Sequence, residues 1–469
     1  MTFFWRILYR GYRVTAWLHH WSQRRYTIPG KAMIAGFMVA AIAGLDIDNT
    51  VGYQAFMLLL FILVIAFLGS RFFRARFRLE RLLPRFGTVG QPFNYRVHIH
   101  NLTRKQQNSL TLLEDFADAR PPFKDWVEFQ KAEGKSVRPF RLNQRRHLNP
   151  FTLATAKDGE VPPLPPNGSG EVNMELMPLK RGVLRFSGAT VARPDPFGLF
   201  RAFVKVTAPQ STLILPKRYL LPAFALPGSM EYQHGGVALA SNVGHSEEFV
   251  ALRDYRRGDP LRHIHWRSWA KTGKPIVKEY EDEFFVRHAL VLDTFCDHPL
   301  SELFEEAVSV AASFACTILT QESLLDLLFV GQEAYCFTSG RGLARADQML
   351  EILASVRACV DKKFDSLEHL VIGHAGTVSG CVCVMLAWDA ARREFVRKLH
   401  ALGVPVLALV IVPRGEGRSF DAGPLRDGPE RLVILEVGNI QYSISKAEHR
   451  SQMQRRTSSS GCSKLNVEC

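Results

Sequence analysis

The sequence predicts a membrane-anchored chain of mixed α and β structure, built from three successive parts. Three observations lead to this fold class: an uncharged apolar run near the N-terminus, alternating strand patterns after it, and a second half in which strand-like and helix-like segments alternate. A chain of 469 residues is long enough for two or three domains, each with its own core. A hydrophobic content of 47% excludes an intrinsically disordered protein.

The first part is predicted to be a transmembrane hairpin of two helices over residues 28–70. Val51–Ser70 contains no charge and, at a rise of ~1.5 Å per residue, crosses a hydrocarbon core of about 30 Å. Ile28–Leu45 reaches about the same length if Lys31 extends to the interface. Both outer flanks are Arg-rich and the loop between the spans is acidic, so both termini are expected in the cytoplasm. A cleaved signal peptide is the alternative for the first span, and the long basic N-terminus (1–27) disfavours it.

The net charge of +14 is concentrated beside this apolar region. Residues 1–31 carry six Lys/Arg and no acid, and residues 71–85 carry six Arg and one Glu, so these two pieces supply 11 of the 14 excess charges. This distribution favours a lipid bilayer over nucleic acid as the partner. All eight cysteines lie beyond residue 290 without a CxxC pair, which favours a reducing compartment over a disulfide framework.

The second part, residues 78–206, has the pattern of a β domain. Apolar and polar residues alternate over Phe93–Ile99 and again over Val172–Leu176, which is the period of a half-buried strand. A further strand is expected over Val183–Val191. Several short strands joined by polar turns predict a β-sandwich of immunoglobulin-like type. A mixed connector, 207–247, follows it.

The third part, residues 284–442, is predicted to be an α/β domain with a parallel sheet covered by helices. The tail after it, 443–469, is polar and Ser-rich and is expected to be disordered. The expected strands are Ala289–Leu292, Leu324–Val330, Cys381–Ala387 and Val404–Val412, and the expected helices are Ser301–Gln321, Leu343–Cys359 and Ala390–Leu402.

Between the second and third parts lies a segment of unusual composition, within 248–283. Residues 253–283 contain eight Lys/Arg, two His and two Trp and end on a cluster of acids. The order of these residues resembles the signature of a bacterial family, the domain of unknown function 58 family, which also carries an element similar to Asp195–Phe200 (DPFGLF). The matching positions are Arg253, Tyr255, Gly258, Asp259, Arg262, Ile264, His265, Trp266, Thr272, Gly273 and Glu279.

The resemblance covers nearly the whole chain and carries implications for its fold and role. It implies a von Willebrand factor A-like fold for the α/β domain. It also implies a multi-pass protein of the cell inner membrane that works as a cytoplasm-facing adaptor or assembly factor beside a MoxR-type AAA+ ATPase. The signature and the sheet domain would then bind the protein partner.

The residues themselves leave several interpretations of the signature open. Its cations are suited to phosphates or to an acidic partner surface. Alternatively the segment is a structural clamp, in which its arginines pair with its own acids. Two further alternatives are an enzyme centred on His265 with Asp259 or Asp254, and a basic phospholipid or nucleic-acid binder that uses Arg253–Lys278. The clamp would pair Arg253, Arg256 and Arg262 with Asp254, Asp259 and the acids of 279–283.

A divalent metal is the one cofactor that the sequence suggests. In von Willebrand A domains an Asp-x-Ser-x-Ser run after the first strand gives the ion hard oxygen ligands. The corresponding run here starts at Asp293 and ends at Asp297, and these two carboxylates are the candidate ligands. Phe295 stands where an oxygen ligand is expected. The alternative is that Asp293 only caps the strand end or a following helix.

Overall fold

The computed structural model forms two compact units, Met1–Lys217 with Glu351–Val356 and Arg218–Leu350 with Arg357–Cys469. It is a mixed α/β chain with several β-sheets. The structure describes residues 2–43, 50–70, 73–118, 120–136, 152–221, 249–257, 259, 261, 264–280, 286–296, 301–317, 323–340, 346–414, 425 and 432–440.

Three helices, α1 (Thr2–Arg25), α2 (Ile28–Ala43) and α3 (Thr50–Ser70), begin the chain. Among the described helices, α3 alone is long and apolar enough to cross a membrane, through Val51–Ser70. The α2 helix is apolar but shorter, and it packs on α3 through Phe37 and Phe56, whose ring centroids are 4.9 Å apart. The prediction of one apolar span is therefore confirmed, and the second span stays a prediction. The acids of the expected loop lie outside the described residues.

Two β-sheets that share one hydrophobic core follow the helices. Alternation explains this core, because Tyr95, Val97 and Ile99 point inward from β3 while Asn94, Arg96 and His98 between them are exposed. The first sheet has the order β1 (Phe77–Leu82), β3 (Phe93–Asn101), β7 (Ser169–Pro178), β5 (Ala154–Ala156), and the second has the order β2 (Phe86–Thr88), β9 (Arg201–Leu215), β8 (Gly182–Pro194), β4 (Leu110–Phe116), β6 (Gly159–Val161).

Three boundaries of the first unit differ from the sequence-based expectation. Residues 2–25, expected only as a basic N-terminus, form helix α1. A helix, α4 (Phe123–Ser136), interrupts the expected β domain, because Trp126 packs on aromatic residues of α1. Strand β9 extends to Leu215 because it pairs antiparallel with the long strand β8. The connector therefore begins later than the expected residue 207.

The second unit contains a six-stranded sheet with five parallel strands and one antiparallel edge strand. Strands β15 and β16 are buried throughout, which explains their uninterrupted apolar sequences. The strand order is β14 (Ala334–Ser339), β13 (Ser323–Val330), β12 (Val286–Leu292), β15 (Gly380–Met385), β16 (Val406–Val412), β17 (Leu432–Glu436).

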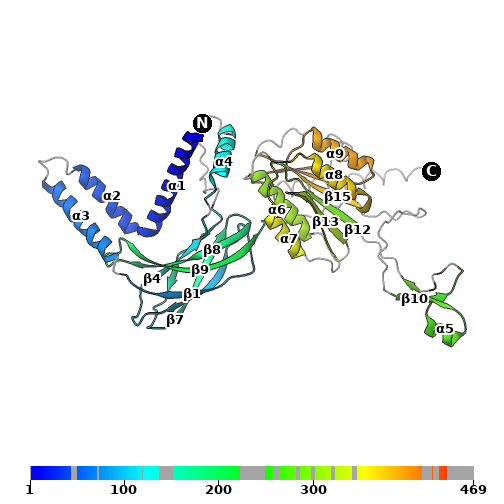
Figure 1. The fold of residues 1–469 in the computed structure, drawn as a ribbon, viewed down its shortest axis with the longest axis horizontal. Coiled ribbons are helices and arrows are strands. Elements are labelled where there is room, and N and C mark those ends of the chain that lie inside the picture. The colour runs from blue at the N-terminus through cyan, green and yellow to red at the C-terminus, as the bar shows by residue number, and fades with distance from the viewer. Residues whose placement is uncertain are drawn as a thin grey trace, which may run out of the picture. The chain divides into compact units, whose positions relative to one another are not determined.

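Helices cover both faces of this sheet (Figure 1). The α8 (Asp365–His374) and α9 (Ala390–Ala401) helices contribute to one core, and α6 (Glu302–Thr317) packs against β12, β15 and β16. The parallel α/β prediction is confirmed, although β14, α8 and β17 were not predicted. The α7 helix (Ala346–Ser355) ends earlier than the expected Cys359. The chain leaves the sheet centre in opposite directions from β12, which is a topological switch point between β12 and β15.

The signature segment forms a small sheet of its own. Strands β10 (Phe249–Asp254) and β11 (Ile276–Tyr280) pair antiparallel, and α5 (Trp266–Thr272) lies between them in the sequence. Residues 222–248 and 281–285 on either side lie outside the described part of the chain, and so does the predicted tail 443–469.

Candidate functional site

The signature segment is held together by an arginine–carboxylate clamp. Arg253 on β10 donates from Nη1 and Nη2 to Asp259 Oδ2 and Oδ1, at 2.7 and 2.8 Å. The backbone N–H of Arg256 donates to the same carboxylate at 2.8 Å. These hydrogen bonds lower the pKa of Asp259 to about 2, so the carboxylate is ionised at neutral pH. The clamp interpretation therefore holds for Arg253 and Asp259.

His265 takes part in a second structural feature, the start of α5. Its backbone N–H donates to Ile276 O at 2.8 Å, and the preceding Ile264 is buried and bridges to Val277. The His265 Nδ1 lies 2.6 Å from Ser268 Oγ. The Asp259 carboxylate is engaged by Arg253 and the His265 ring contacts Ser268, so the described contacts do not join Asp259 and His265 as a catalytic pair.

The α5 helix displays two tryptophans on the segment's surface. Trp266 and Trp269 stack with centroids 5.2 Å apart and planes inclined by 19°, and Trp266 is 65% exposed. Exposed cations surround the pair in sequence, at Arg256, Arg257, Arg267, Lys271 and Lys274. We call the two tryptophans and these five cations the hairpin face. Aromatic and arginine side chains dominate the binding energy of protein interfaces, so the hairpin face is suited to an acidic protein surface.

The other signature residues shape the backbone. The Tyr255 N–H donates to Pro275 O at 3.0 Å, and Thr272 Oγ1 donates to Ser268 O at 3.0 Å. Gly273 ends α5 in the left-handed region, with φ of 69°, which favours glycine. Glu279 lies on β11 opposite Ala251. Gly258, Arg262 and the acids of 281–283 lie outside the described residues.

Asp293 directly follows the central strand β12. It therefore lies at the edge of the sheet formed by the carboxyl ends of the parallel strands, at the switch point. Its carboxylate accepts the backbone N–H of Phe295 on Oδ1 and that of Leu386 on Oδ2, both at 3.0 Å. Arg392 on α9 donates from Nε to the same Oδ2 at 2.6 Å and from Nη1 to Asp389 at 2.6 Å. Asp293 is fully buried. Burial lowers the pKa of Arg392, but the two carboxylates outweigh burial and raise it overall.

The described residues of this edge do not fit a divalent ion. The Arg392 guanidinium already neutralises Asp293, Phe295 packs edge-on against Phe364, and Thr294 donates its hydroxyl to Val330 O at 2.5 Å. No group of three or more His, Cys, Asp or Glu suited to a metal occurs in the described part of the chain. Asp297, the second candidate ligand, lies outside it. Capping by Asp293, the alternative interpretation, agrees with its two backbone hydrogen bonds.

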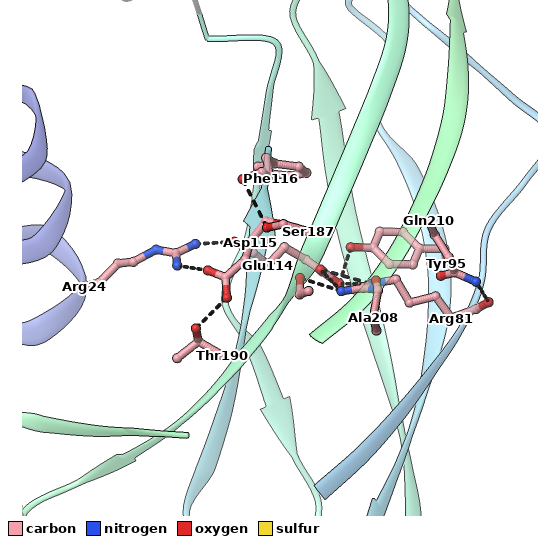
Figure 2. A network of polar contacts seen from close by, with 11 residues as sticks. Arg24, Arg81, Tyr95, Glu114, Asp115, Phe116, Ser187, Thr190, Ala208 and Gln210 are labelled. Atoms are coloured by element: carbon pink, nitrogen blue, oxygen red, sulfur yellow. Dashed lines mark hydrogen bonds and ion pairs between the residues drawn. The ribbon is translucent and has the colours of Figure 1, made fainter. Parts of the chain in front are cut away.

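A polar network in the sandwich was missed by sequence reasoning (Figure 2). Arg81 on β1 donates to the Glu114 carboxylate on β4, with Nη2–Oε2 at 2.8 Å, and both side chains are fully buried. Tyr95 donates its hydroxyl to Glu114 Oε1 at 2.9 Å, and burial together with Glu114 raises the pKa of Tyr95. One signal in the sequence could have revealed it. Arg81 follows Phe77 and Leu79 at steps of two, so this charged residue lies on the same inward-facing side of the strand as those two apolar residues.

The same strand joins this network to helix α1. Asp115, next to Glu114, accepts hydrogen bonds from Arg24 of α1 and from Thr190, the latter at 2.6 Å (Figure 2). Arg24 also donates to the backbone carbonyl of Glu114. The network therefore connects both sheets and α1, and each of its charges is compensated.

Comparison with known proteins gives little functional information. No family model matches the chain. It is 26% identical over 185 residues to the uncharacterised protein YeaD of Bacillus subtilis (strain 168), a match that covers 39% of this chain and 45% of that protein. The chain thus matches less than half the length of this curated relative.

Among solved structures, the CARDB domain of a Pyrococcus furiosus protein is 15% identical and covers 30% of this chain and 93% of its own, with a TM-score of 0.17. A cohesin module from a Clostridium perfringens glycoside hydrolase is 11% identical and covers 30% of this chain and 98% of its own, with a TM-score of 0.14.

Proposed function

We propose that this protein is a membrane-anchored adaptor that binds an acidic surface of a protein partner through the hairpin face. The observation that carries the proposal is the stack of the exposed Trp266 on the half-buried Trp269 among cations, on a segment whose own fold is held by other residues. The α3 helix supplies the anchor. The same proposal includes an inner-membrane location, two spans and both termini in the cytoplasm.

The sequence resemblance sharpens the identity of the partner. A member of the domain of unknown function 58 family is expected to act with a MoxR-type AAA+ ATPase. Under this proposal the sandwich is immunoglobulin-like and the α/β domain is von Willebrand A-like. The internal Arg392 at its switch point supports a binding role that does not depend on a metal ion.

Two observations favour an adaptor over an enzyme centred on His265. Asp259 is engaged by Arg253, and the His265 ring contacts Ser268. A general base needs a proton acceptor within reach of substrate and, in triad-like sites, a carboxylate that orients it. The described contacts of His265 are those of a residue that starts a helix.

The test is affinity capture of the full-length protein from detergent-solubilised membranes, followed by identification and titration of the retained ATPase. Replacing both Trp266 and Trp269 with Ala is expected to weaken capture by at least about tenfold, since buried interface tryptophans contribute about 2 kcal/mol or more. Tyr335→Ala is the matched control, because Tyr335 is an exposed aromatic outside the hairpin face. Unchanged capture by the double variant would contradict the proposal.

The alternative of a phospholipid or nucleic-acid ligand is an outcome of the same experiment. Binding to phosphates falls steeply with salt because counterions are released. A purified full-length protein that binds DNA or anionic vesicles through Arg267 and Lys271, with a steep salt slope and no protein partner, would replace the adaptor proposal by this alternative.

A further inference from the structure

Helix α1 carries two apolar faces, and the described part of the chain packs aromatic side chains on only one of them. Trp5, Tyr9, Tyr12 and Ala16 recur at steps of four and three, so they share one side of a helix of about 3.6 residues per turn. The first three of them surround Trp126 of α4, with ring centroids 5.5 to 6.0 Å apart. Tyr9 also donates its hydroxyl to Pro121 O at 2.8 Å. This face is the one that attaches α1 to the first unit.

The opposite face is apolar and exposed. Phe3, Ile7, Val14 and Leu18 lie about half a turn away from the α4 contact, and their exposed fractions run from 47% to 76%. Trp17 and Trp21 stack at its edge, with centroids 6.3 Å apart. Exposing a second apolar face of a helix to water is unfavourable, so such a face is expected to be covered by a partner or a membrane.

The charges of α1 indicate what covers this face. The helix contains Arg6, Arg10, Arg13, Arg24 and Arg25 and no acid. Exposed apolar side chains flanked by cations, with tryptophan at the boundary, are typical of helices that lie in a membrane surface and face anionic headgroups. A buried protein groove would instead leave these guanidinium groups without solvent.

The position of α1 places it at the level where the apolar helices end. Arg25 Nη2 donates to Ser70 Oγ, the last residue of α3, at 2.8 Å. Thr27, between α1 and α2, donates its backbone N–H to Leu199 O at 3.2 Å and its hydroxyl to Gly198 O at 2.6 Å. Figure 1 shows α1 and α2 diverging from this junction, so α1 does not continue the direction of the apolar pair.

We infer that α1 lies in the plane of an anionic membrane surface, with the Phe3–Leu18 face among the headgroups and acyl ends and α4 on the aqueous side. This inference rests on the membrane anchor of the proposed function and adds a second lipid contact to it. The two contacts together restrict the tilt of the first unit against the membrane more than the anchor does by itself.

The test is site-specific photocrosslinking of the full-length protein in vesicles of phosphatidylethanolamine and phosphatidylglycerol. A photoreactive residue at position 14 or 18 is expected to give a several-fold excess of lipid adduct over the matched control at position 16, which lies on the same side of the helix as Trp5, Tyr9 and Tyr12. Replacing Arg6, Arg10 and Arg13 together with Gln, or using phosphatidylcholine alone, is expected to reduce the adduct several-fold.

Two contrary results are distinguishable. Adducts from positions 14 and 18 to a second copy of the chain, or no excess over position 16, would overturn the surface helix. Extraction of the wild-type protein from the vesicles by alkaline carbonate would instead refute the anchor itself, and this inference with it. Protein that stays in the vesicles without lipid adducts at 14 and 18 refutes the surface helix alone.

Discussion

Each unit of the protein buries an arginine against a carboxylate, and the two pairs are built differently. In the sandwich, Arg81 and Glu114 are both fully buried and join strands of two sheets. In the α/β unit, Asp293 is buried, but Arg392 reaches it from a helix and also holds the half-exposed Asp389. The first pair lies inside the core, while the second lies at the edge where α/β proteins bind ligands.

The difference shows that a buried arginine–carboxylate pair can have two different structural roles. Arg81 donates further to the backbone carbonyls of Gly188 and Ala208, at 2.6 and 2.7 Å, so its donors are satisfied by groups that cannot move without opening the sheets. Arg392 neutralises the buried carboxylate of Asp293 at the carboxyl end of the central strand β12. A buried pair is costly to break because the remaining charge stays in a medium of low polarity.

Breaking the sandwich pair is expected to have the largest effect. Glu114→Gln leaves the Arg81 charge buried without a counter-ion, which we expect to cost about 3–5 kcal/mol of stability in the first unit. The measurement is hydrogen exchange of β3 and β8 in the full-length protein, because it reports on one unit.

The control is Glu171→Gln, which removes one partner of the exposed Arg96–Glu171 pair at 3.3 Å on the same sheet and is expected to cost under about 1 kcal/mol. The double variant Arg81→Met, Glu114→Leu is expected to recover much of the loss, because it removes both charges. A double variant as unstable as Glu114→Gln would show that the network's shape, and not its charge, is what matters.

Breaking the Arg392–Asp293 pair is expected to lower the stability of the second unit by a smaller amount. In Arg392→Met, Asp293 keeps two backbone N–H donors, so we expect a loss of about 1.5–3 kcal/mol, the range for a hydrogen bond to a charged group. Thermal unfolding with hydrogen exchange of β15 measures it. A chelator is expected to leave wild-type unfolding unchanged, and a chelator-induced drop would contradict the assignment of Arg392 as the resident cation.

A substitution at Gly188 tests whether the backbone beside Arg81 is packed as tightly as the surrounding side chains. An added Cβ at this β-bulge would lie 2.2 Å from Val206 O, so Gly188→Ala must shift backbone and is expected to cost about 1–3 kcal/mol. Gly11→Ala on α1 has open space around it and serves as the control. Equal stability of the two variants in hydrogen exchange would contradict the prediction.

The smallest effect is expected at the half-buried third pair, Arg253–Asp259. Its depressed pKa, about 2, means that the stabilisation is complete above the ordinary Asp pKa of 3.8 and is lost as pH falls toward 2. The near-ultraviolet circular dichroism of the Trp266–Trp269 stack should therefore be constant from about pH 8 to 5. Asp259→Asn should remove the acid transition, and an unchanged transition in that variant would assign it to another group.

The sequence carried enough information for the elements whose patterns are local. The uncharged run of α3, the alternation in β3 and β7 and the buried strands β12, β15 and β16 each have a period or length that allows one structure. The missed elements depend on distant partners. Helix α4 is polar on average and is stabilised by Trp126 against α1, and β17 is short and pairs only with β16.

The candidate site was predicted in part. Composition located the signature and suggested the Arg253–Asp259 clamp, because opposite charges a few residues apart pair locally. The role of Arg392 was not predictable in this way, since it lies 99 positions from Asp293 and meets it only when α9 packs beside the switch point. Arg81 and Glu114 are likewise separated in the sequence by two strands, β2 and β3.

The junction at Thr27 sets an order on biosynthesis. Its acceptors, Gly198 and Leu199, lie 171 and 172 positions further along the chain. A chain made from its N-terminus therefore completes α2 and α3 long before the turn that receives Thr27 has left the ribosome. A Cβ added at Gly30 would lie 2.1 Å from Leu199 O, so the absence of a side chain there allows the turn to approach α2. The contact between Thr27 and this turn thus forms only after nearly all of the first unit has been synthesised.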